Sequence, residues 1–599
     1  MNLRTRIWVL RNILIIVITP LLLLPLLIIG TPEAKCGFTL LLMAVYWATE
    51  AFPIAVTSLL PVMLFPMTGL MTGTQTSKTY ITDSSMLFVG GLIMAIAVEH
   101  WNIHRRIALR VLLAVGTRPL MLMIGLMLSA WFLSMWTSNM ATTAMMCPIA
   151  HALLKELEHT EPSGFSSHDA LGEEQNSLEM HKDINSCGVS ENSATIEVVC
   201  NRDEDAPTDA EDKPGDQIDP ASQVPQTSRE HQQMAKAISL SIAYASNIGG
   251  TTTITGCASN IILKGIADEV FAKVGLSSGL NFASWLVVAF PISLLQFILL
   301  FLWLNFYFNG IRCRKRSKTR EEQLYLYLQQ EYRKLGSMRF PEISVLTLFV
   351  VLILSWVSRD LGGVGGWGNI FRYKYVTDSA APTLVAVLLF LIPANIEELF
   401  NSFRGKGPTN IQVKTLLTWN VVHEKLPWGL FLLFGGGFAL AEGCKVSGLS
   451  NWIRQVLVIF SRLPSWITCL LVTILISLVT EVTTNTAAAT LTLPIIQQLA
   501  LSIGQNPLYL MIPATMATSY AFILPVATPP NALVYSLGYV SIYEMMKAGF
   551  ILNFLTVGVA TLGVSTWGAA FFDLNNLPDA FISNRTEMTS FQIKNNTIL

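Results

Sequence analysis

Charged side chains are scarce in this sequence of 599 residues. Only 13% of the residues are Asp, Glu, Lys or Arg, against about 25% in soluble domains. Hydrophobic residues make up 52%, and the mean hydropathy is +0.50. This composition excludes an ordinary soluble domain and predicts an all-α polytopic membrane protein. No basic face is present, so nucleic acid is not an expected partner.

Metal-binding and disulfide patterns are also missing. The eight cysteines are scattered and form no CxxC pair, which favours buried, reduced thiols. His100 and His104 lie four residues apart beside Arg105 and Arg106, an arrangement that fits an interfacial polar cluster better than a metal site.

The acidic residues of the apolar segments give no sign of catalysis. None of them belongs to a His or Ser/Lys arrangement that would build a nucleophile with its base, so we expect no enzyme. Two of them, Glu99 and Glu442, lie near similar Gly-Gly turns, where a structural role is expected. The four acidic residues are Glu50, Glu99, Glu442 and Glu481.

Roughly eleven to thirteen hydrophobic segments are present, several of them too short or too polar to be plain spans. Arg4, Arg6 and Arg11 precede the first apolar run, 13–30. That run could be a signal peptide, but no small-x-small site follows it, and a first span with a cytoplasmic N-terminus is the preferred interpretation. Sequons at Asn584 and Asn595 predict a glycosylated extracellular tail, 574–599.

Two polar segments interrupt the apolar pattern. Residues 155–231 are rich in Glu, Asp, Ser, Pro and Gln and predict a disordered loop. Residues 311–340 begin with a basic cluster and continue as "TREEQLYLYLQQEYRKLG", which predicts a cytoplasmic interfacial helix that links two halves.

The two halves resemble each other. "GGLIMAIAVEHWNIHRRI" begins at Gly90, and "GGFALAEGCKVSGLSNWI" begins 346 residues later at Gly436. The same offset places Asn139 on Asn485, so "SNMATTAMMCP" falls on "TNTAAATLTLP". Both segments place hydroxyls and an asparagine inside apolar sequence, followed by a proline.

A second pair of motifs follows the first. "TGCASN" ends at Asn260 and "VATPPN" ends 271 residues later at Asn531; the change in offset is close to the length of the polar loop. We therefore predict a duplicated unit: 1–154 and 232–310 form the first repeat, and 341–573 the second. Chance similarity among small-residue membrane segments is the alternative. Duplicated, broken segments are typical of secondary transporters whose site lies between the repeats.

Asn, Ser and Thr side chains, with the carbonyls of an unwound turn, are neutral oxygen ligands that suit a sodium ion. Helix N-termini favour an anion. Residues 131–150 and 478–533 contain no Lys or Arg, so a bound anion must be neutralised by helix ends, hydroxyls and co-bound cations. This predicts sodium coupling, unless the turns merely kink packed helices and their hydroxyls bond their own backbone.

Five segments together resemble the divalent-anion sodium symporter family, the animal sodium/carboxylate and sodium/sulfate cotransporters. They are "LSMWTSNMATTAMMCPIAHALL", "YASNIGGTTTITGCASN", "FGGGFALAEGCKVSGLS", "EVTTNTAAATLTLPI" and "SYAFILPVATPPNALV". The resemblance implies two inverted repeats, each with a re-entrant hairpin and an interrupted helix. It also implies a scaffold and a transport domain that moves as an elevator, in a plasma-membrane homodimer surrounded by lipid.

The resemblance also implies the site residues. One sodium site would use Ser134, Ser138, Asn139 and Gly256, and the other Thr480, Thr483, Asn485 and Ala527. A small anionic substrate would contact Asn139, Met140, Asn485, Thr486, Thr528 and Pro529.

Departures from the family pattern fall on the substrate side. Met140 replaces the usual threonine, and "GCASN" lacks the usual Thr and Pro. Family-level analogy favours di- and tricarboxylates such as succinate and citrate, with sulfate as the alternative. An anion channel is the alternative of a different class, although no ring of charges or symmetric filter is visible.

Overall fold

The computed structural model describes most of the chain. The described residues are 3–159, 229–308, 318–360, 365–372, 375–396, 400, 404, 414–457 and 462–581. Most of the expected polar loop and of the expected glycosylated tail lies outside these ranges. Within them, every regular element is a helix, and the only β-bridge joins Pro393 to Thr415.

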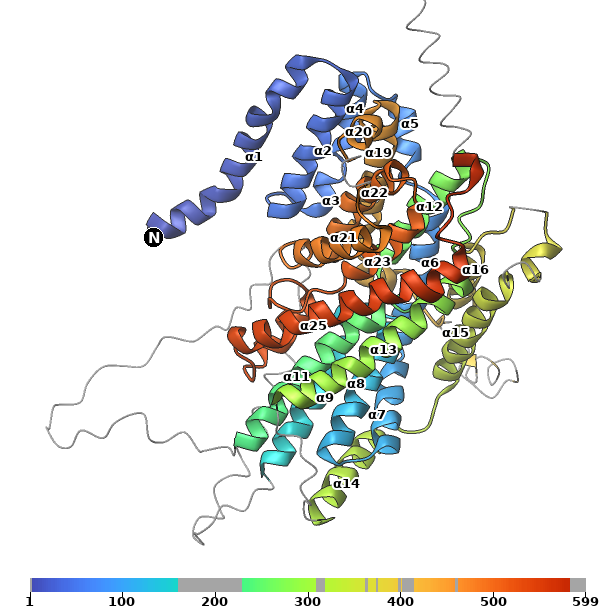
Figure 1. Ribbon diagram of the computed structural model, residues 1–599. Helices are drawn as coiled ribbons and strands as arrows, with labels where there is room; N and C mark the ends of the chain where they lie inside the picture. Colours follow the sequence, from blue (N-terminus) through green and yellow to red (C-terminus); the bar gives the residue numbers. More distant parts are fainter. Residues whose placement is uncertain are drawn as a thin grey trace, which may run out of the picture.

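The helices follow one another along the chain (Figure 1). In the first half they are α1 (Leu3–Ile29), α2 (Pro32–Thr49), α3 (Ile54–Thr57), α4 (Leu60–Thr68), α5 (Gly73–Lys78), α6 (Asp83–His100), α7 (Ile103–Val115), α8 (Pro119–Ser134), α9 (Asn139–His159), α11 (Arg229–Gly250), α12 (Ala258–Lys273) and α13 (Phe282–Phe308). The linker holds α14 (Lys318–Lys334).

The second half continues in the same way. Its helices are α15 (Phe340–Arg359), the short η2 (Trp367–Ile370), α16 (Ala380–Leu391), α18 (Trp419–Lys425), α19 (Trp428–Val446), α20 (Leu449–Leu457), α21 (Ser465–Val479), α22 (Asn485–Ser502), α23 (Pro507–Ala517), α24 (Pro529–Ser536), α25 (Ile542–Gly563), the π-helical turn η4 (Val564–Gly568) and α26 (Ala569–Phe572).

Six helical stretches of the described residues are long and apolar enough to cross a membrane: Arg11–Ile29, Gly73–His100, Phe282–Phe308, Phe340–Arg359, Trp428–Val446 and Ile542–Phe572. Five shorter apolar stretches accompany them: Ile54–Thr68, Pro119–Ser134, Ala380–Leu391, Ser465–Val479 and Pro507–Ala517. The prediction of an all-helical integral membrane protein with several short segments is confirmed.

Local sequence explains where several helices begin. Thr31 accepts a hydrogen bond from the backbone N–H of Ala34 (3.3 Å), and Pro32 occupies the first turn of α2, where its missing N–H costs nothing. At α25, Ser541 and Glu544 form a reciprocal capping box. Pro291 lies inside α13, as proline can within membrane helices whose neighbours satisfy the freed carbonyl.

The boundaries of the polar loop and the linker are now clearer. Helix α9 continues to His159, so it runs past the expected start of the loop at 155. The linker contains α14 as predicted, and this helix lies beside α7 (Figure 1). Leu324 and Leu328 on one face of α14 are buried, while Glu331 forms an ion pair with Arg105 of α7 (3.0 Å). The amphipathic pattern of α14 thus turns its leucines toward the protein interior.

Candidate functional site

Four helix pairs are interrupted where the sequence collects polar residues. The breaks are 135–138 between α8 and α9, 251–257 between α11 and α12, 480–484 between α21 and α22, and 518–528 between α23 and α24. The helices that follow begin at Asn139, Ala258, Asn485 and Pro529. Each break exposes backbone groups within a protein interior, and side chains must satisfy them.

Around the first break, one hydroxyl lies close to two acceptor oxygens but has a single proton to donate. Ser134 Oγ lies 2.7 Å from Asn139 Oδ1 and also 2.7 Å from the Ser246 carbonyl oxygen. A hydroxyl has one proton and can donate to only one of these acceptors. The remaining close approach of two oxygens suits a cation between them. The space also depends on Gly250, where a Cβ would lie 2.3 Å from Asn139 Oδ1.

The same contacts occur around the third break. Thr480 Oγ1 lies 3.2 Å from Asn485 Oδ1 and 2.7 Å from the Thr518 carbonyl oxygen. Thr480 and Asn485 are each 346 residues beyond Ser134 and Asn139. The offset of 346 residues therefore relates the hydroxyl and the asparagine of the two clusters, while the two carbonyls, Ser246 and Thr518, lie 272 residues apart.

Helix caps follow the same offset of 346 residues. Ser138 accepts from the Ala141 N–H (3.2 Å) and Thr484 from the Ala487 N–H (3.3 Å), again 346 residues apart. Thr483 instead donates to the Val479 carbonyl at 3.1 Å. Thr137 makes the same bond to the Leu133 carbonyl (3.0 Å), so Thr483 corresponds to Thr137 and Ser138 to Thr484, as the offset implies.

The other two breaks are each held by an asparagine. Asn260 Nδ2 donates to the Gly250 and Thr253 carbonyls (3.0 and 2.8 Å). Asn531 Nδ2 likewise donates to the Ala521 and Leu524 carbonyls (2.8 and 3.1 Å). Both side chains are buried, and neither Oδ1 has a hydrogen-bond partner among the described residues. Sequence reasoning singled out these asparagines as ends of motifs, and the structure gives them a bracing role.

Helices from the two halves of the chain pack together around the breaks. α24 packs on α9 and α11, while α12 packs on α22 and α23. Asn247 links the two halves: its Oδ1 accepts from Asn139 Nδ2 (3.3 Å) and its Nδ2 donates to Thr528 Oγ1 (3.4 Å). On the other side, Ser259 Oγ donates to the Asn485 carbonyl (3.2 Å).

Three of the expected site residues are therefore bonded to α11 or α12: Asn139 and Thr528 through Asn247, and Asn485 through Ser259. Ser246 and Asn247 were missed as individual residues. They lie within the quoted segment "YASNIGGTTTITGCASN", but only the packing of α11 and α12 reveals which atoms converge.

The remaining expected contacts lie at the breaks or in the first turns of the new helices. Met140 is half-buried in the first turn of α9, and Thr486, which occupies the equivalent place in α22, is buried. Ala527 is buried, and Pro529 is exposed at the start of α24. A Cβ on Gly256 would lie 3.0 Å from the Met135 carbonyl oxygen, so this turn requires glycine.

A buried carboxylate braces the fourth break. Glu481 accepts hydrogen bonds from the backbone N–H groups of Phe522, Ile523 and Leu524 (2.9–3.2 Å) and from Asn553 Nδ2 (2.8 Å). These donors satisfy the charge, so Glu481 fixes the backbone of the turn.

Glu99 and Glu442, for which a structural role was expected, are both ion-paired. Glu99 pairs with Lys425 (2.6 Å), and Glu442 pairs with Lys273 (2.8 Å). These contacts join helices that are distant in the sequence.

The model of the sodium:sulfate symporter transmembrane region matches residues 5–574. The chain belongs to this symporter family. It is 41% identical to the Na(+)/citrate cotransporter of Rattus norvegicus, over 95% of this chain and 96% of that protein. It is 40% identical to solute carrier family 13 member 2 of Oryctolagus cuniculus (97% and 96% covered) and 37% identical to the Na(+)/dicarboxylate cotransporter 3 of Mus musculus (99% and 98% covered). Membership of the symporter family agrees with the resemblance found in the motifs.

Proposed function

We propose that this protein is a sodium-coupled symporter that imports di- and tricarboxylates such as succinate and citrate across the plasma membrane. The observation that carries the proposal is the pair of oxygen clusters at Ser134 and Thr480. Each contains a hydroxyl within reach of two further oxygens and only one proton to share. Two such clusters at equivalent places suit two cations.

We assign the sodium ions to the ligands that the family resemblance implies. The first is built from Ser134, Ser138, Asn139 and Gly256, and the second from Thr480, Thr483, Asn485 and Ala527. Thr483 donates its proton to a carbonyl, so its oxygen retains lone pairs for a cation.

The substrate lies between the two clusters, with contacts from Asn139, Met140, Asn485, Thr486, Thr528 and Pro529. The Asn139–Asn247–Thr528 connection supports this, because it brings the start of α9 and the start of α24 to one place. The N-termini of α9 and α22 add partial positive charge where no Lys or Arg is available. Bound sodium supplies the remaining neutralisation, which couples the two ligands.

Carboxylate is preferred to sulfate because two of the similar proteins are named as cotransporters of citrate and of dicarboxylate. The similarity covers nearly the whole length of both proteins. Met140 makes the first hairpin tip less polar, and this lowers affinity without changing the class of substrate.

The similarity of the two halves supports a transport motion of the elevator type. Residues 1–154 and 232–310 form one repeat and 341–573 the other, in opposite orientation, and the site-bearing helices slide as an elevator against a scaffold that forms a homodimer. The crossing of α24 onto α9 and of α12 onto α22 supports a shared site that moves as one body. The N-terminus is cytoplasmic and the tail, with Asn584 and Asn595, is extracellular and glycosylated.

Uptake in expressing cells tests the proposal. Labelled citrate, succinate and sulfate are compared in sodium and in choline medium, with surface protein measured in parallel. We expect citrate or succinate to accumulate only in sodium. Accumulation of sulfate alone would show that the substrate is sulfate and not a carboxylate. If none of the three anions accumulates in a sodium-dependent way, the proposed function is wrong.

A further inference from the structure

Helix α12 packs both on helices that carry the site and on helices outside it, and the site-bearing helix α22 also packs directly on α19. One side of α12 packs on α22 and α23, which carry the second half of the site, and another side packs on α6 and α19. The second contact is tight: a Cβ on Gly265 would lie 2.4 Å from Phe438 Cζ of α19 and 3.2 Å from Ser84 Oγ of α6. Any movement of the site relative to α6 and α19 must therefore separate this surface.

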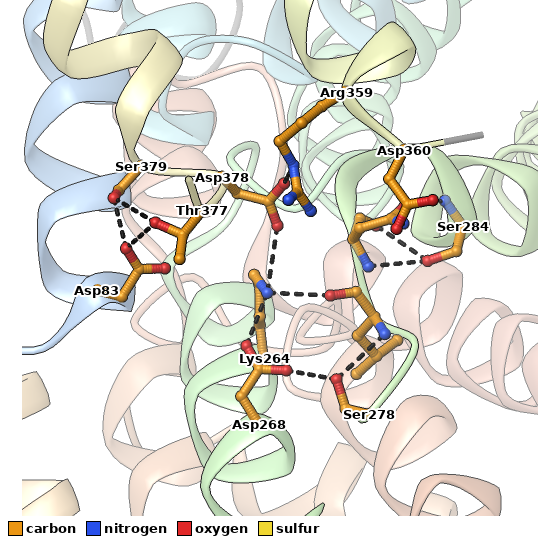
Figure 2. Close-up of polar contacts among 12 residues, drawn as sticks. Asp83, Lys264, Asp268, Ser278, Ser284, Arg359, Asp360, Thr377, Asp378 and Ser379 are labelled. Atoms are coloured by element: carbon orange, nitrogen blue, oxygen red, sulfur yellow. Dashed lines mark hydrogen bonds and ion pairs between the residues drawn. The ribbon is translucent and has the colours of Figure 1, made fainter. Parts of the chain in front are cut away.

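A buried ion pair lies next to this tight contact. Lys264 of α12, only 6% exposed, places Nζ 3.2 Å from Asp378 Oδ2, in the segment that leads into α16 (Figure 2). Asp378 is 3% exposed. Its other oxygen lies 2.6 Å from Arg359 Nε of α15, and its carbonyl accepts from Trp356 Nε1 (3.1 Å). Asp378 is thus fixed to α15, and Lys264 reaches it from α12.

Each charge has a second partner on its own side of the contact. Lys264 also meets Asp268 Oδ2 of its own helix (2.7 Å) and the Leu280 carbonyl (3.0 Å), whereas Asp378 has Arg359 (Figure 2). A buried charge left alone is strongly destabilising. Here, separation of Lys264 from Asp378 leaves both charges paired, which makes the contact reversible.

A second lysine of α12 also has one partner on its own helix and one partner on a neighbouring helix. Lys273 pairs with Glu269 one turn earlier on α12 and with Glu442 Oε2 of α19 at 2.8 Å. If α12 moves away from α19, Lys273 keeps Glu269. Two lysines on one helix thus share an arrangement of one partner on the helix and one across the contact.

We propose that Lys264–Asp378, assisted by Lys273–Glu442, is a latch that holds the site-bearing helices against α6, α15, α16 and α19 and opens in each transport cycle. The role of this latch in transport depends on the proposed function. Its opening is a property of the molecule that can be measured without transport.

The test measures how often the contact opens. Ser84 is 5% exposed and lies under α12, so a Ser84→Cys thiol reacts with a small maleimide only when α12 moves away. Its labelling rate in the purified full-length protein then follows the population of the open form. Lys264→Gln is the preferred perturbation because it leaves Asp378 with Arg359 and leaves Asp268 40% exposed.

We expect Lys264→Gln to raise the labelling rate of Ser84→Cys by roughly fivefold or more, and Lys264→Arg to keep it near the starting rate. Native Cys469, buried between α21 and α23 away from this contact, is the internal control and should label at an unchanged rate. If Lys264→Gln folds poorly, Glu442→Gln perturbs the second pair and should act in the same direction.

Two results would overturn the latch: an unchanged rate at Ser84→Cys, or an equal rise at Cys469, which signals general loosening. Uptake of citrate in sodium medium is measured separately on the wild-type protein. The labelling result therefore stands or fails on its own, whatever that uptake shows.

Discussion

The asparagines that brace two of the helix breaks give the sharpest test of how the site is built. Asn531 is fully buried, and its amide donates to two carbonyls of the break, at 2.8 and 3.1 Å. Asn531→Asp keeps the shape but removes both donors. Each buried acceptor left unpaired costs about 1–3 kcal/mol, so the break loses roughly 2–6 kcal/mol of stabilisation.

That loss should appear mainly as weaker sodium binding. Glu481 still holds three backbone N–H groups of this break, so the fold around it survives. If about 1.4 kcal/mol of the loss falls on the sodium-bound form, the half-saturating sodium concentration rises tenfold. Asn260→Asp should lower surface expression more, because Met135 stands at the position equivalent to Glu481 and its break lacks that brace.

The assay is a sodium titration of citrate uptake at saturating citrate, normalised to surface protein. Asn531→Ala removes the same donors and also leaves a cavity, so it should be at least as impaired as Asn531→Asp. Wild-type sodium dependence in Asn531→Asp would refute the reasoning, since the amide donors would then be unnecessary.

Three further predictions concern the site itself. Asn139→Ala and Asn485→Ala should each abolish sodium-dependent uptake while the protein remains at the surface, because each removes an oxygen from one cluster; unchanged sodium dependence in a titration would disprove the assignment. Met140→Thr should tighten the apparent affinity for carboxylates by roughly ten- to a hundred-fold, since a hydrogen bond to a charged group contributes about 1.5–3 kcal/mol; an affinity within twofold of wild type in dose-response curves would place Met140 in packing. Cys257, the one free cysteine of the described residues that is not buried, precedes α12 at the site; a charged methanethiosulfonate should inhibit uptake, with protection by citrate and resistance in Cys257→Ser, and inhibition that citrate does not slow would place the thiol outside the pocket.

The breaks could be predicted from sequence because their signal is local. Polar residues inside apolar runs mark the helix ends, and α9 and α22 begin at the two asparagines that the repeat offset had aligned. The composition likewise predicted a helical membrane protein, because only helices or closed barrels satisfy the backbone in lipid.

Contacts between distant segments could not be predicted in the same way. Asn247 links Asn139 to Thr528 only because α24 packs on both α9 and α11. Lys264 and Asp378 come from different halves of the chain, and neither has a sequence neighbour that indicates the other. The different roles of Ser138 and Thr483, in contrast, follow from the offset of 346 residues, which aligns Ser138 with Thr484 and Thr137 with Thr483.

Sodium-driven accumulation in a reconstituted system tests the central claim most directly. The purified protein is placed in liposomes, and internal labelled citrate is followed with an inward sodium gradient and after the gradient is collapsed with a sodium ionophore. We predict transient accumulation above the external concentration with the gradient and none without it. Citrate that merely equilibrates, at the same rate in both conditions, would indicate a channel-like pathway and contradict sodium-coupled symport.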